Sequence, residues 1–498
     1  MVVCSLTETR LSRNALSKPV VDSPPGIVHL GLGAFARAHL AEYVRKANDL
    51  QPNEPWYICG VSLRNPNVRD ALRPQDGVYT IVERDGPRSR PNDRFVVCDS
   101  VSEVLYAGDD AAAIQERLVS ADTRIISMTV TEKGYCRLPD GTLDTNNRDV
   151  AHDIRALGVQ PDAVVKSLPG WLAQAIVARS RRDLPVTVIS LDNLPNNGRS
   201  LRRVVCAMLS YVDEQALGWL EAGNVTFPSS VLDRIVPATT DEDCRDVAAQ
   251  LKCHDAWPVV TEPYNNWVLE NHFCSGQPHW SDAGVTLVAD ATPFEEAKLR
   301  LLNGPHSFIA YLGQLTDRET VADVMAEPQN QLAVQCLMAE AEQTLNMPDS
   351  FDLSTYQREI VARFHNEALR HHTAQIAMDG SEKIPQRWLA VIESLRSQRK
   401  PARYLACALA LWIRYLHGSS ETGAALTISD PRVEQLASIV SETSEPVQIV
   451  ADVFRLLDSS LADDVPLVNS VAQFYTDLVE GGVAVLIGRL IGGQIVQR

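Results

Sequence analysis

The stretch IVHLGLGAFAR, residues 27–37, decides the fold of the first half of the chain. It opens with a short apolar run typical of a buried strand, and two glycines follow at once with the spacing G-x-G-x-x-A. In this pattern Gly31 makes a tight turn, Gly33 lets a ligand approach the backbone, and Ala36 lets a helix pack closely. Free amides at the start of such a helix attract phosphate. The stretch predicts a dinucleotide-binding strand, turn and helix, with a glycine-rich turn that binds nothing as the alternative.

A second strand is predicted over residues 56–63, where a dinucleotide-binding unit needs the side chain that reads the adenosine ribose. No aspartate or glutamate ends this strand, and Arg64 follows it instead. An arginine there can meet the 2′-phosphate of NADP or can simply be solvated. The residues alone leave the choice between NAD and NADP open.

Two further buried strands are predicted over residues 124–131 and 186–191, and polar residues follow each of them. Open α/β sheets bind ligands at the carboxyl ends of their strands, which makes Asn193 a candidate ligand contact. Residues 196–198, Asn-Asn-Gly, are more typical of a turn. The residues expected to contact the dinucleotide are Gly31, Leu32, Gly33, Ala34, Phe35, Ala36, Arg37, Arg64, Thr131 and Glu132.

The chain changes character near residue 285. Before this point apolar strand-like runs alternate with helical patterns, which favours a parallel sheet with crossover helices, and afterwards nearly every pattern is helical. We therefore predict an α/β fold with a Rossmann-like, doubly wound dinucleotide-binding domain over residues 1–285. A largely all-α substrate and catalytic domain is expected over residues 286–498.

Residues 290–313, DATPFEEAKLRLLNGPHSFIAYLG, contain a helix with a clear start. Thr292 has the character of an N-cap, Pro293 suits the first helical position, and Glu295 completes a capping-box pattern. Pro305 removes an amide donor and clashes with the carbonyl four residues back. We therefore expect the chain to leave the helix between Asn303 and His306.

The same helix carries an amine, an amide and an imidazole. At about 100° per residue, Glu295, Lys298 and His306 share one side of it, with Asn303 at the edge. A lysine with a depressed pKa can accept a proton, while an amide and a protonated imidazole can donate to an oxygen, so the set suits the interconversion of an alcohol and a carbonyl. Alternatively, Lys298 is a solvated lysine, Glu295 only a cap and His306 a packed core residue.

Seven blocks in order resemble the polyol-specific long-chain dehydrogenases, the mannitol dehydrogenase family. The blocks are IVHLGLGAFARAHL, MTVTEKGYC, VISLDNLPNNG, VLDRIVPATT, VVTEPYNNWVLENHF, KLRLLNGPHS and QIAMDGSEKIPQRW. The resemblance implies a metal-independent hydride transfer between a sugar alcohol or sugar acid and a nicotinamide, and it favours NAD. By position it implies that Lys298 is the general base, that Asn193 and Asn303 polarise the reacting oxygen, that His306 binds substrate, and that Lys383 is a further substrate contact.

Three positions depart from the family pattern. Ala36 stands where the family usually has histidine, and Pro305 stands where it usually has serine. Pro66-Asn67 replaces an acidic pair that some members use to prefer NAD. These departures put local geometry and cofactor preference in doubt, but they remove no residue of the proposed chemistry.

The segment 369–387 bears on the substrate. Mannitol enzymes tend to carry arginine where Gln375 stands, and the block is closer to the branch that interconverts D-fructuronate and D-mannonate. That substrate has a carboxylate, which needs cationic or hydrogen-bonding partners. Candidates in this segment are Arg370, His371, His372, Lys383 and Arg387, and the expected substrate-binding set is Lys383, Arg387, His372 and Gln375. A mannitol or other polyol 2-dehydrogenase is the first alternative, and a non-catalytic dinucleotide-binding sensor is the second.

Composition narrows the partners. With 63 acidic and 46 basic residues the net charge is −17, which disfavours nucleic acid and anionic membranes. The ten cysteines lack paired zinc spacing, so no metal site is expected. The first twenty residues lack an apolar signal core and no long apolar run occurs elsewhere, so a cytoplasmic protein is expected. A small sugar acid or polyol is the expected partner, and the oligomeric state stays open.

Overall fold

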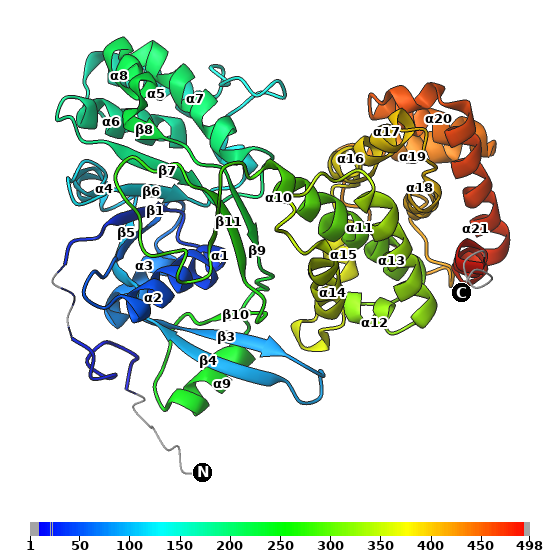
Figure 1. The fold of residues 1–498 in the computed structure, drawn as a ribbon, viewed down its shortest axis with the longest axis horizontal. Helices are drawn as coiled ribbons and strands as arrows, with labels where there is room; N and C mark the ends of the chain where they lie inside the picture. Colours follow the sequence, from blue (N-terminus) through cyan, green and yellow to red (C-terminus); the bar gives the residue numbers. More distant parts are fainter. Residues whose placement is uncertain (1–8, 20, 22, 493–498) are drawn as a thin grey trace. The chain divides into compact units, whose positions relative to one another are not determined.

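The computed structural model describes residues 9–19, 21 and 23–492 of the 498-residue chain. Residues 1–8 and 20 of the segment searched for a signal core lie outside the described residues. The described chain divides into two compact units, the first containing Asn92–Thr292 and the chain before it as far as Arg84, the second containing Asp85–Pro91 and the chain from Pro293 onward. Figure 1 labels their elements.

A parallel sheet forms the centre of the first unit. Its strands are β1 (Ile27–Leu30), β2 (Ile58–Ser62), β5 (Val101–Tyr106), β6 (Ile125–Met128), β7 (Val186–Ser190) and β8 (Val225–Thr226). They lie in the order β5-β2-β1-β6-β7-β8, with every pairing parallel. This is the strand order of dinucleotide-binding domains, in which the order reverses at the first strand. The predicted Rossmann-like sheet is confirmed.

Helices cover both faces of the sheet, because successive side chains of each strand point to opposite faces. Val28 and Leu30 of β1 enter a core built with helices α4 to α8, whereas Ile27 enters a second core with α1 to α3. The helices of this unit are α1 (Ala34–Ala38), α2 (Leu40–Leu50), α3 (Asn67–Leu72), α4 (Ala111–Leu118), α5 (Arg148–Val159), α6 (Leu168–Ser180), α7 (Asn197–Val212), α8 (Glu214–Trp219) and α9 (Asp241–Leu251). Alternate side chains of one strand thus pack against different helices, so the sheet is doubly wound.

Two small sheets complete the first unit. One has the order β10-β3-β4 and the other β12-β11-β9. Their strands are β3 (Tyr79–Asp85), β4 (Asn92–Cys98), β9 (Ser230–Asp233), β10 (Val259–Thr261), β11 (Asn266–Glu270) and β12 (Thr286–Val288). Strand structure therefore extends past residue 285, because β12 pairs with β11.

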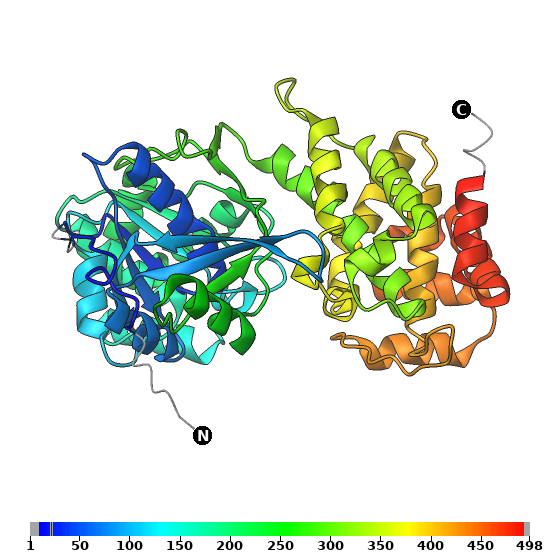
Figure 2. The ribbon, with the colours of Figure 1, turned by 90° about the horizontal axis from the view of Figure 1, so that it is seen from below.

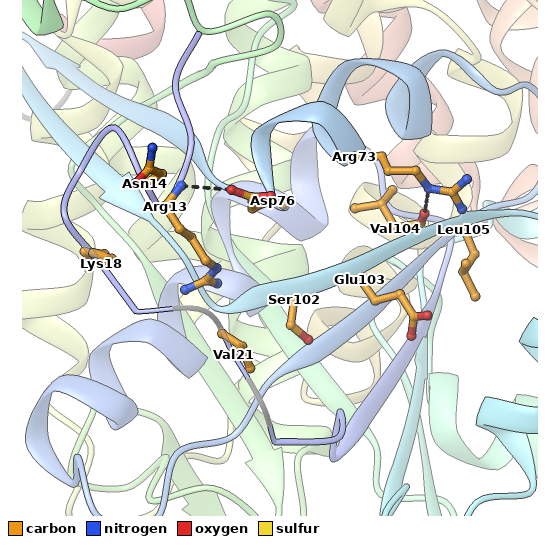
Figure 3. A pocket seen from close by; sticks show the side chains of 11 residues that line it. Arg13, Asn14, Lys18, Val21, Arg73, Asp76, Ser102, Glu103, Val104 and Leu105 are labelled. Atoms are coloured by element: carbon orange, nitrogen blue, oxygen red, sulfur yellow. Dashed lines mark hydrogen bonds between the residues drawn. The ribbon is translucent and has the colours of Figure 1, made fainter. Parts of the chain in front are cut away.

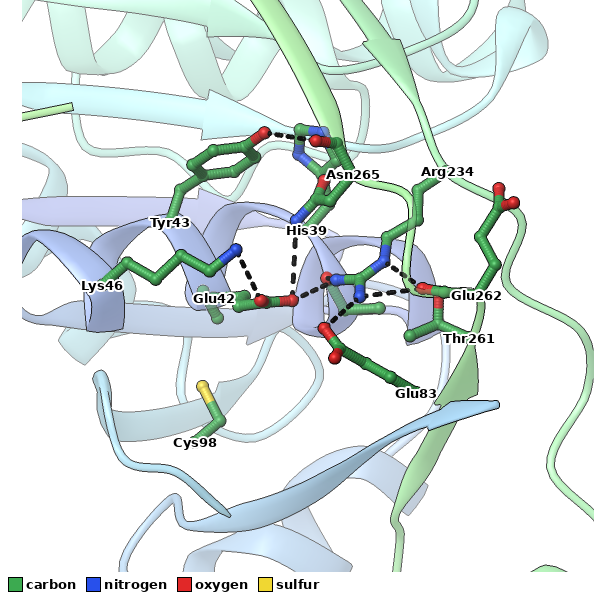
Figure 4. Close-up of polar contacts among 12 residues, drawn as sticks. His39, Glu42, Tyr43, Lys46, Glu83, Cys98, Arg234, Thr261, Glu262 and Asn265 are labelled. Atoms are coloured by element: carbon green, nitrogen blue, oxygen red, sulfur yellow. Dashed lines mark hydrogen bonds and ion pairs between the residues drawn. The ribbon is translucent and has the colours of Figure 1, made fainter. Parts of the chain in front are cut away.

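A buried ion network ties four of these elements together (Figure 4). Arg234, which follows β9, pairs with Glu42 of α2 and with Glu83 of β3, the latter at 2.9 Å between Nη2 and Oε1. The guanidinium also donates to the carbonyl oxygen of Glu262 after β10, at 3.0 Å from Nη2. The side chains of Arg234 and Glu42 are both fully buried, so loss of either would disturb a charge balance that Glu83 and Lys46 share.

The second unit is built from helices (Figures 1 and 2). They are α10 (Thr292–Ala297), α11 (Gly304–Leu315), α12 (Val321–Met325), α13 (Pro328–Glu342), α14 (Leu353–Phe364), α15 (Thr373–Ala377), α16 (Gly380–Ile384), α17 (Ala390–Ser397), α18 (Arg403–Tyr415), α19 (Val433–Glu442), α20 (Pro446–Leu456) and α21 (Val465–Gly492). Helix α18 is buried along most of its length and packs against α11 and α21. The predicted helical region is confirmed.

Candidate active site

The turn after β1 has the backbone that its glycines predict. Gly31 has a φ of +99°, and a Cβ atom there would lie 2.1 Å from the carbonyl oxygen of Thr129. Only glycine fits such a position. Gly33 is exposed, and its nearest neighbour is the Gly31 carbonyl oxygen, 3.8 Å from a Cβ placed there. The turn thus has a tightly enclosed first glycine and an open second glycine that a ligand can approach.

The predicted cofactor residues around this turn fall into two groups. Ala34 and Phe35 are half-buried at the start of α1, beside Gly33. Leu32 and Ala36 are buried in the core, as close packing of strand and helix requires. Arg37 is also buried, and its guanidinium donates to the carbonyl oxygen of Trp257 and lies over the Tyr79 ring. The core therefore holds the charge of the Arg37 side chain, and the expected contact of Arg37 with a dinucleotide stays a prediction.

Four other predicted residues lie at the carboxyl ends of strands of the sheet. Arg64 is exposed after β2, at the position where an acidic residue would favour NAD over NADP. Thr131 and Glu132 are exposed after β6, and Asn193 is exposed after β7. Since β6 and β7 are adjacent and parallel, these ends lie at one edge of the sheet. The first unit thus gathers these candidates where α/β sheets bind ligands.

Asp192 was not among the predicted site residues, although it occupies the same edge. Its Oδ1 atom accepts hydrogen bonds from the backbone amides of Val130 (2.9 Å) and Thr131 (3.0 Å), and its Oδ2 atom accepts one from the Tyr135 hydroxyl (2.9 Å). Burial raises the pKa of this carboxyl, and the bonds from Thr131, Tyr135 and Val130 oppose that rise. An aspartate directly before Asn193, at the end of a predicted strand, was the sequence signal that could have identified it.

In the second unit, the helix that begins at Thr292 does not break at Pro305. A π-helical turn, Lys298–Asn303, joins α10 to α11, and Gly304 donates its amide to the carbonyl oxygen of Leu299, five residues back. The predicted break between Asn303 and His306 is wrong, because the wider turn accommodates the missing amide of Pro305 without leaving helical geometry.

The π-helical turn changes which side chains share a face. In an α-helix, residues five positions apart point about 140° away from each other. Hydrogen bonds from i to i+5 align them instead, so Lys298 and Asn303 come to the same side. Both are half-buried. The π-helical turn thus moves Asn303 from the edge of the predicted face to the side of Lys298, and an amine and an amide are brought together.

Arg387, expected to bind substrate, holds this turn in place. Its Nη1 atom donates to the carbonyl oxygen of Asn303 (3.0 Å) and to the hydroxyl of Ser307 (2.8 Å). Trp388 donates its indole N–H to the carbonyl oxygen of Gly304 at 3.1 Å. Burial lowers the pKa of Arg387 to about 10. Arg387 and Trp388 lie in a second π-helical turn, Pro385–Leu389, which therefore supports the turn Lys298–Asn303.

His306 is buried, and its surroundings disfavour the protonated ring. Its ring lies 4.6 Å from the Phe364 ring and 5.0 Å from the His371 ring, and burial lowers its pKa well below the usual value. Among the residues that the structure describes, the Nε2 atom of His306 and the Nδ1 atom of His371 have no hydrogen-bond partner. Burial thus disfavours the protonated imidazole that we expected, and a neutral ring can still donate from one nitrogen.

The other residues expected to bind substrate differ in whether their side chains already contact other groups. Lys383 donates to the carbonyl oxygens of Ile376 (3.3 Å) and Met378 (2.6 Å), so its ammonium caps the end of α15. His372 lies 3.4 Å from the Glu319 carboxylate. Gln375 is exposed on α15. Of the predicted set, Arg387 is the one whose contacts reach the turn of Lys298 and Asn303.

A separate hollow of about 520 Å³ in the first unit contains none of these candidates (Figure 3). Its lining includes Arg13, Lys18 and Arg73, whose charges are already engaged. Lys18 lies 2.5 Å from Asp99, and Arg73 lies 3.0 Å from Asp110. Cations that are paired in this way offer little attraction for an anion.

Neither a metal centre nor a membrane helix is found in the part of the chain that the structure describes. Its His, Cys, Asp and Glu residues form no group that could hold a metal ion. No described helix is both long and apolar enough to span a bilayer.

Comparisons with known proteins match both units. Residues 25–282 match the Mannitol dehydrogenase Rossmann domain, and residues 290–479 match the Mannitol dehydrogenase C-terminal domain. D-mannonate oxidoreductase of Escherichia coli (strain K12) is 37% identical over 475 residues, which cover 93% of this chain and 95% of that protein. A mannitol 2-dehydrogenase of Pyrenophora tritici-repentis is 37% identical over 429 residues, covering 84% and 74%.

A solved structure supports the same assignment. Pseudomonas fluorescens mannitol 2-dehydrogenase, in a ternary complex with NAD and D-mannitol, aligns with a TM-score of 0.81 at 31% identity over 98% of this chain and 97% of that one. The resemblance predicted from the seven sequence blocks is confirmed. The chain belongs to the mannitol dehydrogenase family of oxidoreductases.

Proposed function

We propose that this protein catalyses the NADH-linked reduction of D-fructuronate to D-mannonate, and the reverse oxidation. The observation that carries the reaction class is the π-helical turn that brings the amine of Lys298 and the amide of Asn303 to one side of a half-buried helix. An amine that exchanges a proton beside an amide that holds an oxygen suits the interconversion of an alcohol and a carbonyl.

The residues of the first unit fit a nicotinamide dinucleotide. Gly31 fixes the turn, and the open backbone of Gly33 with the first residues of α1 can hold the pyrophosphate. Bound NADH supplies the hydride that the keto carbon receives. NAD is proposed rather than NADP because the solved relative binds NAD. Arg64 is a cation at the end of β2 that can pair with the 2′-phosphate of NADP, so the assay should also include NADPH.

Lys298 and the two asparagines perform the proton chemistry in this proposal. Asn193 and Asn303 donate to the C5 keto oxygen, which gains negative charge as hydride arrives at C5. Lys298, as the ammonium, then gives one proton to that oxygen, so fructuronate, NADH and one proton yield mannonate and NAD. In the oxidation direction neutral Lys298 removes the hydroxyl proton.

The proposed substrate class rests on the carboxylate. Gln375 stands where mannitol enzymes tend to carry arginine, and D-mannonate oxidoreductase is similar over nearly the whole chain. Arg387 uses Nη1 for Asn303 and Ser307, and the described residues give its Nη2 and Nε atoms no hydrogen-bond partner. We assign the carboxylate to these N–H groups, since a guanidinium binds carboxylates with two parallel bonds.

The deciding measurement is kcat/KM with NADH for fructuronate against fructose, which differ chiefly in that carboxylate. Fructuronate is expected to be preferred by ~100-fold or more, as is usual when a charged partner is lost from a binding site. A preference for fructose would replace this proposal by mannitol 2-dehydrogenase activity, which the solved complex with D-mannitol favours as second candidate. Binding of NADH without turnover of any ketose or uronate would instead support a non-catalytic sensor.

A further inference from the structure

Asp192 joins two loops that follow neighbouring strands. The loop after β7 contains Asp192, whose carboxylate reaches across to the loop after β6 and accepts the amides of Val130 and Thr131 through one oxygen. The other oxygen accepts the hydroxyl of Tyr135, which also contacts the Ser190 hydroxyl. One carboxylate therefore fixes the backbone of one loop from the other.

Thr131 needs such support because its backbone is strained. Its φ of 70° and ψ of 163° lie in a region that is essentially reserved for glycine. A residue persists there only when surrounding contacts determine its position. The Asp192 carboxylate holds the amide of Thr131 at 3.0 Å, and the Thr131 carbonyl accepts the amide of Gly134 at 3.0 Å. Both sides of the strained residue are therefore tied.

Asp192 is itself held firmly. Its carbonyl oxygen accepts the side-chain amide of Asn197 at 3.0 Å and the backbone amide of Leu194 at 2.9 Å. Just before it, Leu191 extends the ladder between β7 and β6 by donating to the carbonyl oxygen of Met128 at 2.9 Å. Asp192 is 6% exposed as a residue, so solvent competes little for these bonds.

We infer that Asp192 is a positioning residue for hydride transfer: its carboxylate locks the Thr131–Glu132 backbone and the neighbouring Asn193 amide into one arrangement at the sheet edge. This inference rests on the proposed use of that edge by the nicotinamide and the reacting oxygen. Asp192 touches neither of them in this assignment. It acts through Thr131 and Asn193, both of which are exposed there.

The test uses three variants of the full-length protein. Asp192→Ala removes the clamp, and Asp192→Asn keeps its volume and one acceptor oxygen. The matched control is Asp153→Asn, since Asp153 is also fully buried and accepts the amides of Lys166 (2.9 Å) and Ser167 (2.8 Å), but lies on α5. Readouts are kcat and KM separately, the primary deuterium isotope effect with 4-deuterated NADH, the Kd for NADH, and hydrogen exchange of residues 130–135.

We expect Asp192→Asn to lower kcat by ~10-fold and Asp192→Ala by ~100-fold, the scale of a misplaced reacting group. The isotope effect should rise in both, because hydride transfer becomes slower than product release. Exchange at residues 130–135 should accelerate, and the Kd for NADH should increase by about ten-fold in the alanine variant. Asp153→Asn should lower Tm without changing KM or the isotope effect.

The inference is overturned if Asp192→Asn keeps the wild-type kcat and isotope effect, or if its losses only follow the fraction of folded protein, as in the control. Asparagine at 192 keeps the inference testable where alanine prevents folding. Kinetics are measured on whichever sugar the wild-type protein reduces, so a wrong substrate assignment shows in the wild type alone. NADH binding and hydrogen exchange need no substrate at all.

Discussion

Two turns of this molecule bear its proposed chemistry, and they are specified in different ways. The turn at Gly31 in the first unit follows from one local constraint, because any side chain there would meet the Thr129 carbonyl oxygen. The π-helical turn Lys298–Asn303 of the second unit contains no such constraint. It is held by Arg387, which contacts Asn303 from 84 residues further along the chain.

The difference has a physical consequence. A turn enforced by the absence of a Cβ atom keeps its shape as long as the sequence is unchanged. A π-helical turn gives up regular α-helical bonding, and such turns occur frequently at functional sites. The second turn should therefore depend on distant contacts, and substitutions should separate the two.

The largest expected effect is at Lys298. Lys298→Ala should lower kcat/KM for alcohol oxidation by at least ~10², the scale of a lost general base, and should leave the Kd for NADH within about three-fold. Steady-state kinetics and fluorescence titration measure both quantities. Lys400→Ala, which removes an ammonium that donates to the Gln343 carbonyl oxygen, is the control and should behave as wild type. Near-normal turnover without Lys298 would remove this turn from the mechanism.

Substitutions at the two glycines test the first turn. Gly31→Ala introduces a Cβ atom 2.1 Å from a carbonyl oxygen, so it should lower Tm and raise the Kd for NADH by ~30-fold or more. Gly33→Ala meets nothing closer than 3.8 Å, so Tm should hold while the Kd rises by about ten-fold. Calorimetry and NADH titration separate the two. Equal losses of Tm would contradict the local origin of the first turn.

This contrast explains what the sequence could predict. The order of strands and helices and the βαβ glycine turn were predictable, because strand, glycine and helix signals are local. The apolar alternation of β1 likewise places Val28 and Ile27 in different cores. The π-helical turn, the burial of Arg37 and the clamp of Asp192 were not predictable, since each depends on partners distant in the chain: Asn303 for Arg387, Trp257 for Arg37, and Thr131 for Asp192.

The second turn should respond to its distant support. Arg387→Met keeps apolar packing but removes the bonds to Asn303 and Ser307, so kcat/KM should fall by ~10- to 100-fold through the misplaced amide of Asn303. Arg396→Met is a matched control that breaks an ion pair with Asp464 in the same unit. Kinetics with fructose as well as fructuronate separate positioning from carboxylate binding, because only positioning affects both sugars. Unchanged kinetics with both would show that the turn needs no such support.

The smallest expected effect is a pH dependence of stability, and it also distinguishes the two regions. Each has an imidazole that is shielded from solvent, fully buried at His29 and half-buried at His371. His29, beside the first turn, has contacts at both ring nitrogens, with the Ser127 hydroxyl at 2.9 Å and the Gly31 carbonyl at 3.3 Å. His371, beside His306, has no partner for Nδ1 within the described part of the chain. Burial lowers the pKa of His29 to about 4 and that of His371 to about 4.

Because both imidazoles are neutral when folded, protons bind to the unfolded chain first as pH falls. The contribution of each neutral imidazole to the free energy of unfolding is complete above about pH 6.5, the pKa of histidine in the unfolded chain. It declines towards pH 4 by about 1.4 kcal/mol per pH unit for each histidine. His371→Phe should reduce the pH dependence of the free energy of unfolding, measured by denaturant titration at pH 7.5, 6.5 and 5.5. Its cost in stability at pH 7.5 should be small because no hydrogen bond is lost. His29→Phe should also reduce that pH dependence, but at a cost of about 1–3 kcal/mol at every pH because the Ser127 hydroxyl, the Gly31 carbonyl and the Thr129 hydroxyl each lose a contact with the ring. The exposed His365→Phe is the control. Identical slopes for wild type and His371→Phe would mean that this imidazole is not held neutral.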